Sequence, residues 1–478
     1  GVPQPLKLFG TPEQKKKYLP RFAKGEISAF ALTELEAGSD PAKMTTTAVP
    51  TADGKNYILN GKKLWCTNGP VADVLVVMAR TPSIMVRGKE RPQITAFIVE
   101  TKTPGYKVLN RCDFMGIRGI QNGLTEFKDM VVPAENILWG LGKGLKLALT
   151  TLNTGRLTLP AASAGIGKQC LWIARTWGQE RVQWGSPVGR HDHGAAKIAS
   201  IACDTFAMEA VTWLSSALAD RGDTDIRLEA AMSKLFCSEA AWRAVDQTVQ
   251  LRGGRGYETG PSLKARGEKG IPTERIMRDT RINMIIEGTS EVMRLFIARE
   301  ALDVHMKVAG DLFKPQVPAG AKLKALARTA LFYAWWYPST FLSWGWWPRY
   351  AGAGRMATHL RFVNRNSRKL ARSVFHSMVR FGPGLERRQR ILGRLVDIGT
   401  DLFAMSACIS RARMLSKQNP TDPSALDLAD LFCRGARRRI YHAFCELYWN
   451  EDRAAARLAG KIMDGKVSWL EEGIIKAG

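Results

Sequence analysis

The sequence has few features of a disulfide-bonded, metal-binding or membrane-spanning protein. Only eight of its 478 residues are cysteine, no two form a CxxC pair, and they lie scattered in apolar stretches. This pattern predicts reduced, buried thiols in a reducing compartment. Of the six histidines only His191 and His193 lie close together, without a cysteine or acidic cluster, so no metal site is predicted. No run of about 18 apolar residues exists, which excludes an ordinary transmembrane helix, and no signal peptide is visible.

Acidic residues are scarce in the last third of the chain. Residues 306–478 contain 29 Lys or Arg but 13 Asp or Glu, and therefore carry +16 of the total net charge of +26. Between Asp311 and Glu386 no acidic residue occurs at all. The whole chain is 45% apolar and 24% charged, which is ordinary for a globular protein and excludes intrinsic disorder. The local excess of cations predicts that this third faces an anionic partner.

The first part of the chain changes from a helical to a strand pattern. Residues 11–26 predict a short basic helix, with Thr11 as N-cap and Pro12 at the first helical position. From 27 to 137 short alternating apolar runs are separated by Asp-Gly and Asn-Gly turn signals, which predict an all-β block.

Helical spacing dominates the rest of the chain. Apolar residues three and four positions apart continue from about 140 to 304, interrupted by the glycine-rich stretch 252–260, and the pattern resumes at 356. A sheet between helical regions does not alternate strands with helices, so the chain is not a doubly wound nucleotide-binding fold.

A tryptophan-rich segment lies inside the basic third. Residues 331–350 are rich in aromatic side chains, are interrupted by Pro338 and Pro348, and have cations around them. Trp and Tyr favour the lipid headgroup level, and cations are drawn to anionic lipid. We therefore predict an interfacial membrane-docking segment. The alternative is a bridge packed against the helical domains, while no motif of a nucleic-acid-binding fold is present. Its tryptophans are Trp335, Trp336, Trp344, Trp346 and Trp347.

Glu287 is the candidate catalytic base. It follows Ile285 and Ile286 and precedes Gly288. Apolar neighbours are expected to raise its pKa by desolvation, which makes a carboxylate usable as a general base near neutral pH. The alternative is a glutamate at a helix end, satisfied by the following backbone amides.

Four further motifs carry weak signals when taken singly. The glycines of QLRGGRGYET (250–259) allow backbone amides to approach phosphate, although a turn between helices looks the same. In ALTELEAGSD (31–40) small and hydroxyl side chains suit contact with a planar or phosphorylated ligand. In WCTNG (65–69) a tryptophan beside a hydroxyl can cover an aromatic ring. In ERVQWGSPVG (180–189) an arginine can pair with phosphate.

Together and in this order, these motifs resemble those of the acyl-CoA dehydrogenase family over residues 4–300. The very-long-chain branch is the most similar, because it shares Asn-x-Gly-Arg at Asn153–Arg156, an acidic residue at Glu291, and a C-terminal helical extension of this length. The segments that carry the resemblance are LTELEAGSD, WCTNG, GRLTLPAAS, ERVQWGSPVG, QLRGGRGY and IIEGTSEVMRL.

The resemblance implies a role for each matching position. Glu287 matches the base that removes the α-proton of an acyl-CoA thioester, with FAD accepting the β-hydrogen as a hydride. Ile286 stands where medium-chain relatives have an aromatic residue. The positions that match flavin contacts are Leu32, Thr33, Trp65, Thr67, Arg181, His191, Gln250, Gly253, Gly254, Thr289 and Glu291. The positions that match substrate contacts are Ser39, Asn153, Arg156 and Ile286, of which Asn153 and Arg156 correspond to contacts with CoA.

The resemblance also implies an α+β multidomain fold, with a β-barrel or sandwich domain between helical domains and an extra C-terminal helical domain. The expected parts are a remnant of the N-terminal helical domain (1–26), a middle β domain (27–137), a helical bundle with the base (138–305), a basic Trp-rich linker (306–355) and an additional helical domain (356–478).

The expected function is FAD-dependent oxidation of long-chain acyl-CoA in fatty-acid β-oxidation, with electrons passing to an electron-transfer flavoprotein. A homodimer is expected, because a neighbouring subunit completes the flavin site in the family. The expected location is peripheral to a membrane, in a bacterial cytoplasm or a mitochondrial matrix. Two alternatives remain open: an acyl-CoA oxidase, and a catalytically weak assembly factor for a respiratory membrane complex.

Overall fold

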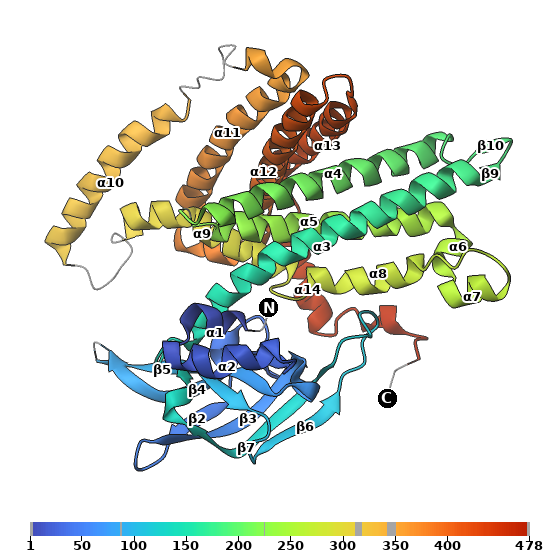
Figure 1. Ribbon diagram of the computed structural model, residues 1–478. Coiled ribbons are helices and arrows are strands. Elements are labelled where there is room, and N and C mark those ends of the chain that lie inside the picture. Colours follow the sequence, from blue (N-terminus) through green and yellow to red (C-terminus); the bar gives the residue numbers. More distant parts are fainter. Residues whose placement is uncertain (1–2, 87, 224, 311–317, 342–349, 476–478) are drawn as a thin grey trace. The chain divides into compact units, whose positions relative to one another are not determined.

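A computed structural model of the chain divides into two units (Figure 1). The first comprises Gly1–Met293 and the second Arg294–Gly478, so the boundary lies inside helix α9 (Ser290–Ala309). The structure describes all residues except 1–2, 87, 224, 311–317, 342–349 and 476–478. Three of the five tryptophans of the 331–350 segment, at 344, 346 and 347, lie outside the described residues.

Two short helices begin the first unit, α1 (Gln4–Phe9) and α2 (Pro12–Ala23). The predicted cap of α2 is confirmed. The Thr11 hydroxyl accepts a hydrogen bond from the Gln14 amide at 3.2 Å, and the Gln14 side chain accepts one from the Thr11 amide at 3.1 Å. This reciprocal pair satisfies two backbone donors that the start of a helix otherwise leaves without partners.

The predicted β block folds into one mixed sheet. Its strands follow the order β6-β7-β3-β2-β4-β5-β8, and β1 also pairs with β4. The pairings of β1 and β2 with β4 are parallel and the others are antiparallel. The strands are β1 (Ser28–Ala31), β2 (Thr47–Pro50), β3 (Asn56–Thr67), β4 (Val74–Val86), β5 (Lys89–Glu100), β6 (Tyr106–Arg111), β7 (Asn122–Pro133) and β8 (Ile137–Leu138).

Strand β4 is buried on both faces over its first half. Leu75 and Val77 belong to one apolar cluster, which includes residues of β3 and β7. Val74 and Val76 belong to a second cluster, which includes residues of α1, α2 and the start of α3 (Gly144–Glu180). Because alternate side chains of a strand point to opposite faces, a strand covered twice needs an uninterrupted apolar run. This explains the sequence VLVVMA at this position.

Three long helices, α3, α4 and α5, pack side by side in the first unit (Figure 1). Ala174 of α3, Ile201 of α4 and Val245 of α5 share one buried apolar cluster. The glycine-rich stretch that follows α5 contains the four-residue helix α6. The remaining helices of this region are α4 (Asp192–Arg221), α5 (Arg227–Arg252), α6 (Gly254–Tyr257), α7 (Gly260–Ala265) and α8 (Thr273–Arg281).

The second unit is helical, as its spacing predicts. Helices α12 and α13 pack against each other, and Arg439 of α13 donates two hydrogen bonds to Asp401 of α12, at 2.6 and 3.0 Å. Among the described residues no helix is long and apolar enough to cross a membrane. The helices that follow α9 are α10 (Ala319–Ser339), α11 (Ala357–Phe381), α12 (Gln389–Gln418), α13 (Ser424–Glu446) and α14 (Asp452–Met463).

The expectation about the cysteines is correct only in part. All eight are free thiols and six are buried, but Cys112 is half-buried and Cys445 is exposed. Cys445 lies near the end of α13, on the side that faces away from the apolar core of the second unit, so its apolar sequence neighbours do not bury it.

A buried ion pair fixes the loop between β1 and β2. Lys63 of β3 has no exposed surface, and its Nζ lies 2.8 Å from Oε1 of Glu34. Burial by itself would raise the pKa of Glu34, but the charge of Lys63 and hydrogen bonds from Lys63, Thr46 and Thr45 lower it to about 2. Lys63 Nζ also donates to the carbonyl of Leu32 at 3.1 Å. The loop is thus tied to β3 through one lysine.

We predict that Lys63→Met lowers the free energy of unfolding by about 3–5 kcal/mol, because Glu34 is left buried without its counter-charge. Chemical denaturation of the full chain measures this. The adjacent Lys62→Met is the matched control, since Lys62 is half-exposed and pairs with Glu126 at 3.4 Å, where a loss of at most about 1 kcal/mol is expected. Equal losses of unfolding free energy in the two variants would contradict the stabilising role of the buried Lys63–Glu34 pair.

Candidate active site

Glu287 lies in a strained turn between the short helix η4 (Ile282–Met284) and α9. Its φ is +55°, and that of Gly288 is +96°. A positive φ is uncommon outside glycine, and at a functional site it indicates a backbone held in place by its surroundings. The group that holds it is Lys234 of α5, whose Nζ donates to the carbonyl of Gly288 at 2.6 Å.

The carboxylate of Glu287 is not satisfied by backbone amides. Its Oε2 atom is buried and has no hydrogen-bond partner within the described part of the chain. Burial raises the pKa of Glu287, while the charges of Arg156 and Lys234 oppose the rise. The alternative of a capped helix-end glutamate is therefore wrong. A buried carboxyl with a raised pKa and no partner is suited to accept a proton from a bound molecule.

The source of this burial differs from the one expected. Ile285 and Ile286 are 47% and 37% exposed, so they are not the main cover of the carboxylate. The cover comes from α3, where a Cβ on Gly155 would overlap the carboxylate oxygens of Glu287. Glycine at this position therefore leaves the space that the carboxylate occupies.

Asn153 and Arg156, the expected CoA contacts, lie on α3 next to this turn. Arg156 is only 5% exposed, and its Nη1 donates to Asn153 Oδ1 at 3.0 Å. Burial lowers the pKa of Arg156, and the charge of Glu287 opposes the shift. The structure thus places Arg156 as a buried counter-charge of Glu287, and its contact with CoA stays a prediction. Thr289 and Glu291 follow the base at the start of α9, where the Thr289 hydroxyl accepts from the Val292 amide at 3.3 Å.

Sequence reasoning missed Lys234. It is fully buried, and burial lowers its pKa to about 8 although the charge of Glu287 acts in the opposite direction. The available signal was a lysine within the apolar run AAMSKLFC, on a helix whose neighbouring positions are buried. A charge at such a position requires a buried partner.

The expected flavin residues of the β region lie together near the end of β3. Leu64 N–H donates to the Thr33 carbonyl at 2.9 Å, which places the loop containing Leu32 beside the end of β3. A register shift between Lys63 and Cys66 accompanies a φ of +53° at Trp65, whose side chain is 57% exposed. Ser39 lies further along this loop and is exposed.

Asn122, which sequence reasoning also missed, orients the Thr67 hydroxyl. Asn122 is 4% exposed, and its Nδ2 donates to Thr67 Oγ1 at 2.9 Å. Since the oxygen of Thr67 already accepts this bond, its proton remains available for an acceptor on a ligand. An outward-facing indole beside such a hydroxyl fits a flat heteroaromatic ring system such as flavin.

The other expected flavin residues lie at the far end of the helices. Arg181 follows the last residue of α3, and His191 precedes α4, with its Nε2 2.9 Å from the carbonyl oxygen of Gln183. Trp177 Nε1 donates to the Leu251 carbonyl at 3.1 Å, which joins this end of α3 to the end of α5. Gln250, Gly253 and Gly254 are exposed there, and open space lies above both glycines.

The structure therefore separates the expected site into two groups. Arg156 and Arg181 are 25 residues apart along one helix, which corresponds to about 38 Å at 1.5 Å per residue. Within one chain, Arg181 and Glu287 do not share a pocket. Among the described residues no cluster of three or more His, Cys, Asp or Glu side chains has the arrangement of a metal site.

We predict a specific effect of Lys234 on the pH dependence of the base. In both Lys234→Gln and Lys234→Met a cation that lowers the pKa of Glu287 is lost, so the acidic limb of a kcat/KM profile should move to higher pH. Glutamine retains a donor for the Gly288 carbonyl and methionine does not. We expect the limb to shift equally in both variants, because both lose the charge of Lys234. We expect a larger loss of kcat in the methionine variant, because only that variant also loses the hydrogen bond that positions the turn. A limb that stays in place would refute the electrostatic role.

Three family models match the chain. Residues 29–130 match the acyl-CoA dehydrogenase middle domain, 142–302 the acyl-CoA dehydrogenase C-terminal domain, and 355–465 the ACAD9/ACADV C-terminal domain. The probable acyl-CoA dehydrogenase FadE10 of Mycobacterium tuberculosis is 51% identical, over 99% of this chain and 73% of its own length. The human mitochondrial very long-chain specific acyl-CoA dehydrogenase is 35% identical, over 92% of this chain and 66% of its own.

Solved structures agree with this likeness. An acyl-CoA dehydrogenase of Bacillus anthracis complexed with FAD is 29% identical, has a TM-score of 0.77, and covers 96% of this chain and 76% of that one. Butyryl-CoA dehydrogenase of Megasphaera elsdenii is 35% identical, with a TM-score of 0.56 over 62% of this chain and 74% of its own.

Proposed function

This chain belongs to the acyl-CoA dehydrogenase family, and we propose that it oxidises long-chain acyl-CoA to trans-2-enoyl-CoA with FAD as cofactor. The observation that carries the proposal is the buried carboxylate of Glu287, which has a raised pKa and an Oε2 atom without a partner in the described residues. The outward-facing Trp65 and the Thr67 hydroxyl oriented by Asn122 fit the flavin ring.

In this reaction Glu287 takes the α-proton of the acyl thioester. FAD, when bound, supplies the oxidising chemistry by accepting the β-hydrogen as a hydride. The N–H of Glu287 donates to no carbonyl in the described chain, so it is available to the thioester oxygen on which negative charge develops. The charges of Arg156 and Lys234 oppose the rise that burial causes in the pKa of Glu287.

The long-chain specificity and the electron acceptor are proposals of the same kind. Support for the chain length comes from the match at 355–465 and from the human relative, whose name specifies very long chains. We propose an electron-transfer flavoprotein as the acceptor and fatty-acid β-oxidation as the pathway. Support for the acceptor comes from a similar solved structure, 35% identical, which is described as an electron transferring flavoprotein of Acidaminococcus fermentans.

We also propose a homodimer or larger oligomer. The predicted phosphate-side residues of the flavin site, Arg181 and Gln250 to Gly254, lie about 38 Å along α3 from the residues next to Glu287. One chain therefore does not bring both groups to one flavin, and a second copy is the simplest source of the missing half.

We predict that Glu287→Gln keeps its flavin but is reduced by palmitoyl-CoA about 10²–10⁴-fold more slowly, because the amide cannot accept the α-proton. Anaerobic visible spectra before and after addition of palmitoyl-CoA measure both properties. Glu135→Gln, a change of an exposed glutamate, is the control and should bleach like the unmodified protein. If palmitoyl-CoA reduces the flavin of Glu287→Gln as fast as that of the unmodified protein, Glu287 is not the catalytic base. Hydrogen peroxide formed in air at the rate of turnover would identify an oxidase instead.

Peripheral membrane docking is proposed for α10. Trp336 packs on His305, Tyr333 and Phe375, so part of the aromatic segment is internal to the second unit. Trp335 is 77% exposed, and Leu331, one turn earlier, is 76% exposed. An exposed aromatic and aliphatic face next to cations suits the headgroup region of a membrane, in either a bacterial cytoplasm or a mitochondrial matrix.

We predict that Trp335→Ala weakens binding to vesicles of anionic lipid roughly tenfold, because a large side chain no longer inserts. Co-sedimentation of the full chain with vesicles measures the effect. Trp469→Ala removes a tryptophan that is also exposed (64%) but lies outside α10, and should bind normally. Loss of binding in both variants, or in neither, would exclude α10 as the docking element.

A further inference from the structure

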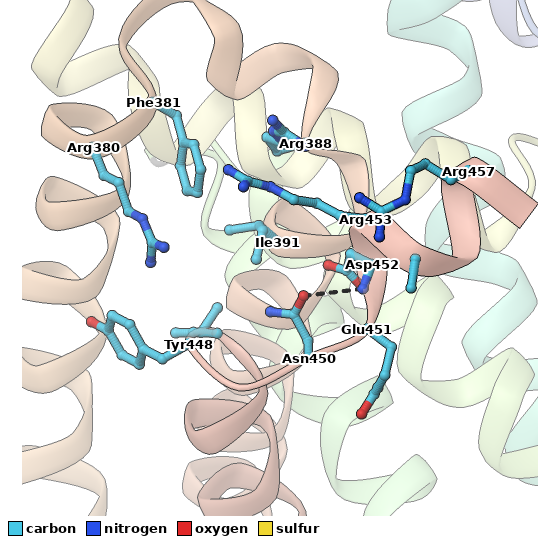
Figure 2. A pocket seen from close by; sticks show the side chains of 12 residues that line it. Arg380, Phe381, Arg388, Ile391, Tyr448, Asn450, Glu451, Asp452, Arg453 and Arg457 are labelled. Atoms are coloured by element: carbon cyan, nitrogen blue, oxygen red, sulfur yellow. Dashed lines mark hydrogen bonds between the residues drawn. The ribbon is translucent and has the colours of Figure 1, made fainter.

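The second unit contains a basic pocket that the acyl-CoA reaction does not use. It lies between the end of α11, the start of α12 and the turn that leads into α14, and has a volume of about 380 Å³ (Figure 2). Four arginines line it, namely Arg380, Arg388, Arg453 and Arg457. All four are exposed at its rim, so they are accessible from solvent.

None of the four arginines forms an ion pair within the described residues. The pocket also has two carboxylates, Asp452 and Glu451. Asp452 is already occupied, because Arg394 donates to both of its oxygens at 2.6 and 2.9 Å and Arg390 lies 3.0 Å away. Figure 2 shows the side chain of Glu451 pointing away from the arginines. The pocket therefore has an excess of positive charge that no internal partner cancels.

The pocket holds its cations in a defined arrangement. The guanidinium carbons of Arg380 and Arg388 lie 5.2 and 5.6 Å from the centre of the Phe381 ring, which is within the range of cation–π contacts. In Figure 2 Arg380 and Phe381 enter from one side, and Arg453 and Arg457 from the other. Four like charges converging on one space repel one another, and a bound anion removes this repulsion.

The start of α14 adds backbone donors to the same pocket. The first helical residue, Asp452, donates its N–H to Asn450 Oδ1 at 3.2 Å. The next two amides, of Arg453 and Ala454, are first-turn donors that have no acceptor inside the helix, and both residues line the pocket. Backbone amides at a helix start and guanidinium groups are donors that phosphate groups prefer, and both kinds belong to residues that line this pocket.

The floor of the pocket is apolar. Ile391 and Leu447 line it and are 5% and 4% exposed. Beneath the guanidinium groups, this apolar floor offers a surface for the organic substituent of a phosphate ester.

We propose that this pocket binds the phosphate group of a phosphate ester. Two sources have this chemistry: the headgroup of a phospholipid and a soluble phosphate ester. All residues of the pocket lie between Arg380 and Arg457, whereas Glu287 and α10 lie outside this range. The proposal therefore does not depend on the acyl-CoA reaction or on the docking of α10.

The test uses the full-length holoprotein with two probes, inorganic pyrophosphate in titration calorimetry and phosphatidic-acid vesicles in co-sedimentation. In the double variant Arg380→Gln/Arg453→Gln one cation is removed from each side of the pocket. The matched control is Arg361→Gln/Arg438→Gln, which removes the same charge from arginines that do not line it. We expect at least tenfold weaker binding in the pocket variant and less than twofold in the control.

The outcomes separate the sources and can overturn the proposal. Loss of both pyrophosphate and vesicle binding in the pocket variant indicates a phosphate site that lipid headgroups also reach. Loss of pyrophosphate binding alone indicates a soluble ligand. Equal weakening in the two double variants would show diffuse surface charge, and no binding of either probe to the unmodified protein would also overturn the proposal. Trp335→Ala should leave pyrophosphate binding unchanged, which keeps this test independent of membrane docking.

Discussion

The turn that contains Glu287 depends on one buried cation. Lys234 is fully buried on α5 and reaches the carbonyl of Gly288 with its ammonium group, directly after the base. A buried charge without compensation is strongly destabilising, so the turn and the lysine require each other. The same ammonium group limits the pKa of Glu287, which burial raises. Lys234 thus acts on the position of Glu287, through the Gly288 carbonyl, and on its pKa, which the charge of Arg156 also lowers.

The length of α3 explains how the rest of the site is organised. Near its start α3 contributes Gly155 and Arg156 to the surroundings of Glu287, and at its end it leads into Arg181. A helix of 37 residues is about 55 Å long, which is too long for both ends to serve one pocket of the same subunit. This separation along α3 is the observation that supports the proposed oligomer.

Several of the few carboxylates of the second unit form ion pairs between helices. Asp401 pairs with Arg439, while Asp452 and Glu446 both pair with Arg394, which is itself 8% exposed. These three carboxylates help to hold α12, α13 and α14 together. The remaining cations lie at the surface and include the arginines of the basic pocket. They are the positive charges that an anionic partner can neutralise.

Local signals determined much of the fold. The Thr11 cap and Pro12 predicted the start of α2, and the apolar run at Val74–Ala79 predicted a strand, because capping and side-chain alternation act over a few residues. The ordered motifs also identified the family. The sequence did not reveal Lys234, Asn122 or the role of Gly155. It also did not show that Glu287 is buried by α3 and α5 more than by Ile285 and Ile286. Those features were decided only by the tertiary structure, because burial and charge compensation depend on which distant segments pack together.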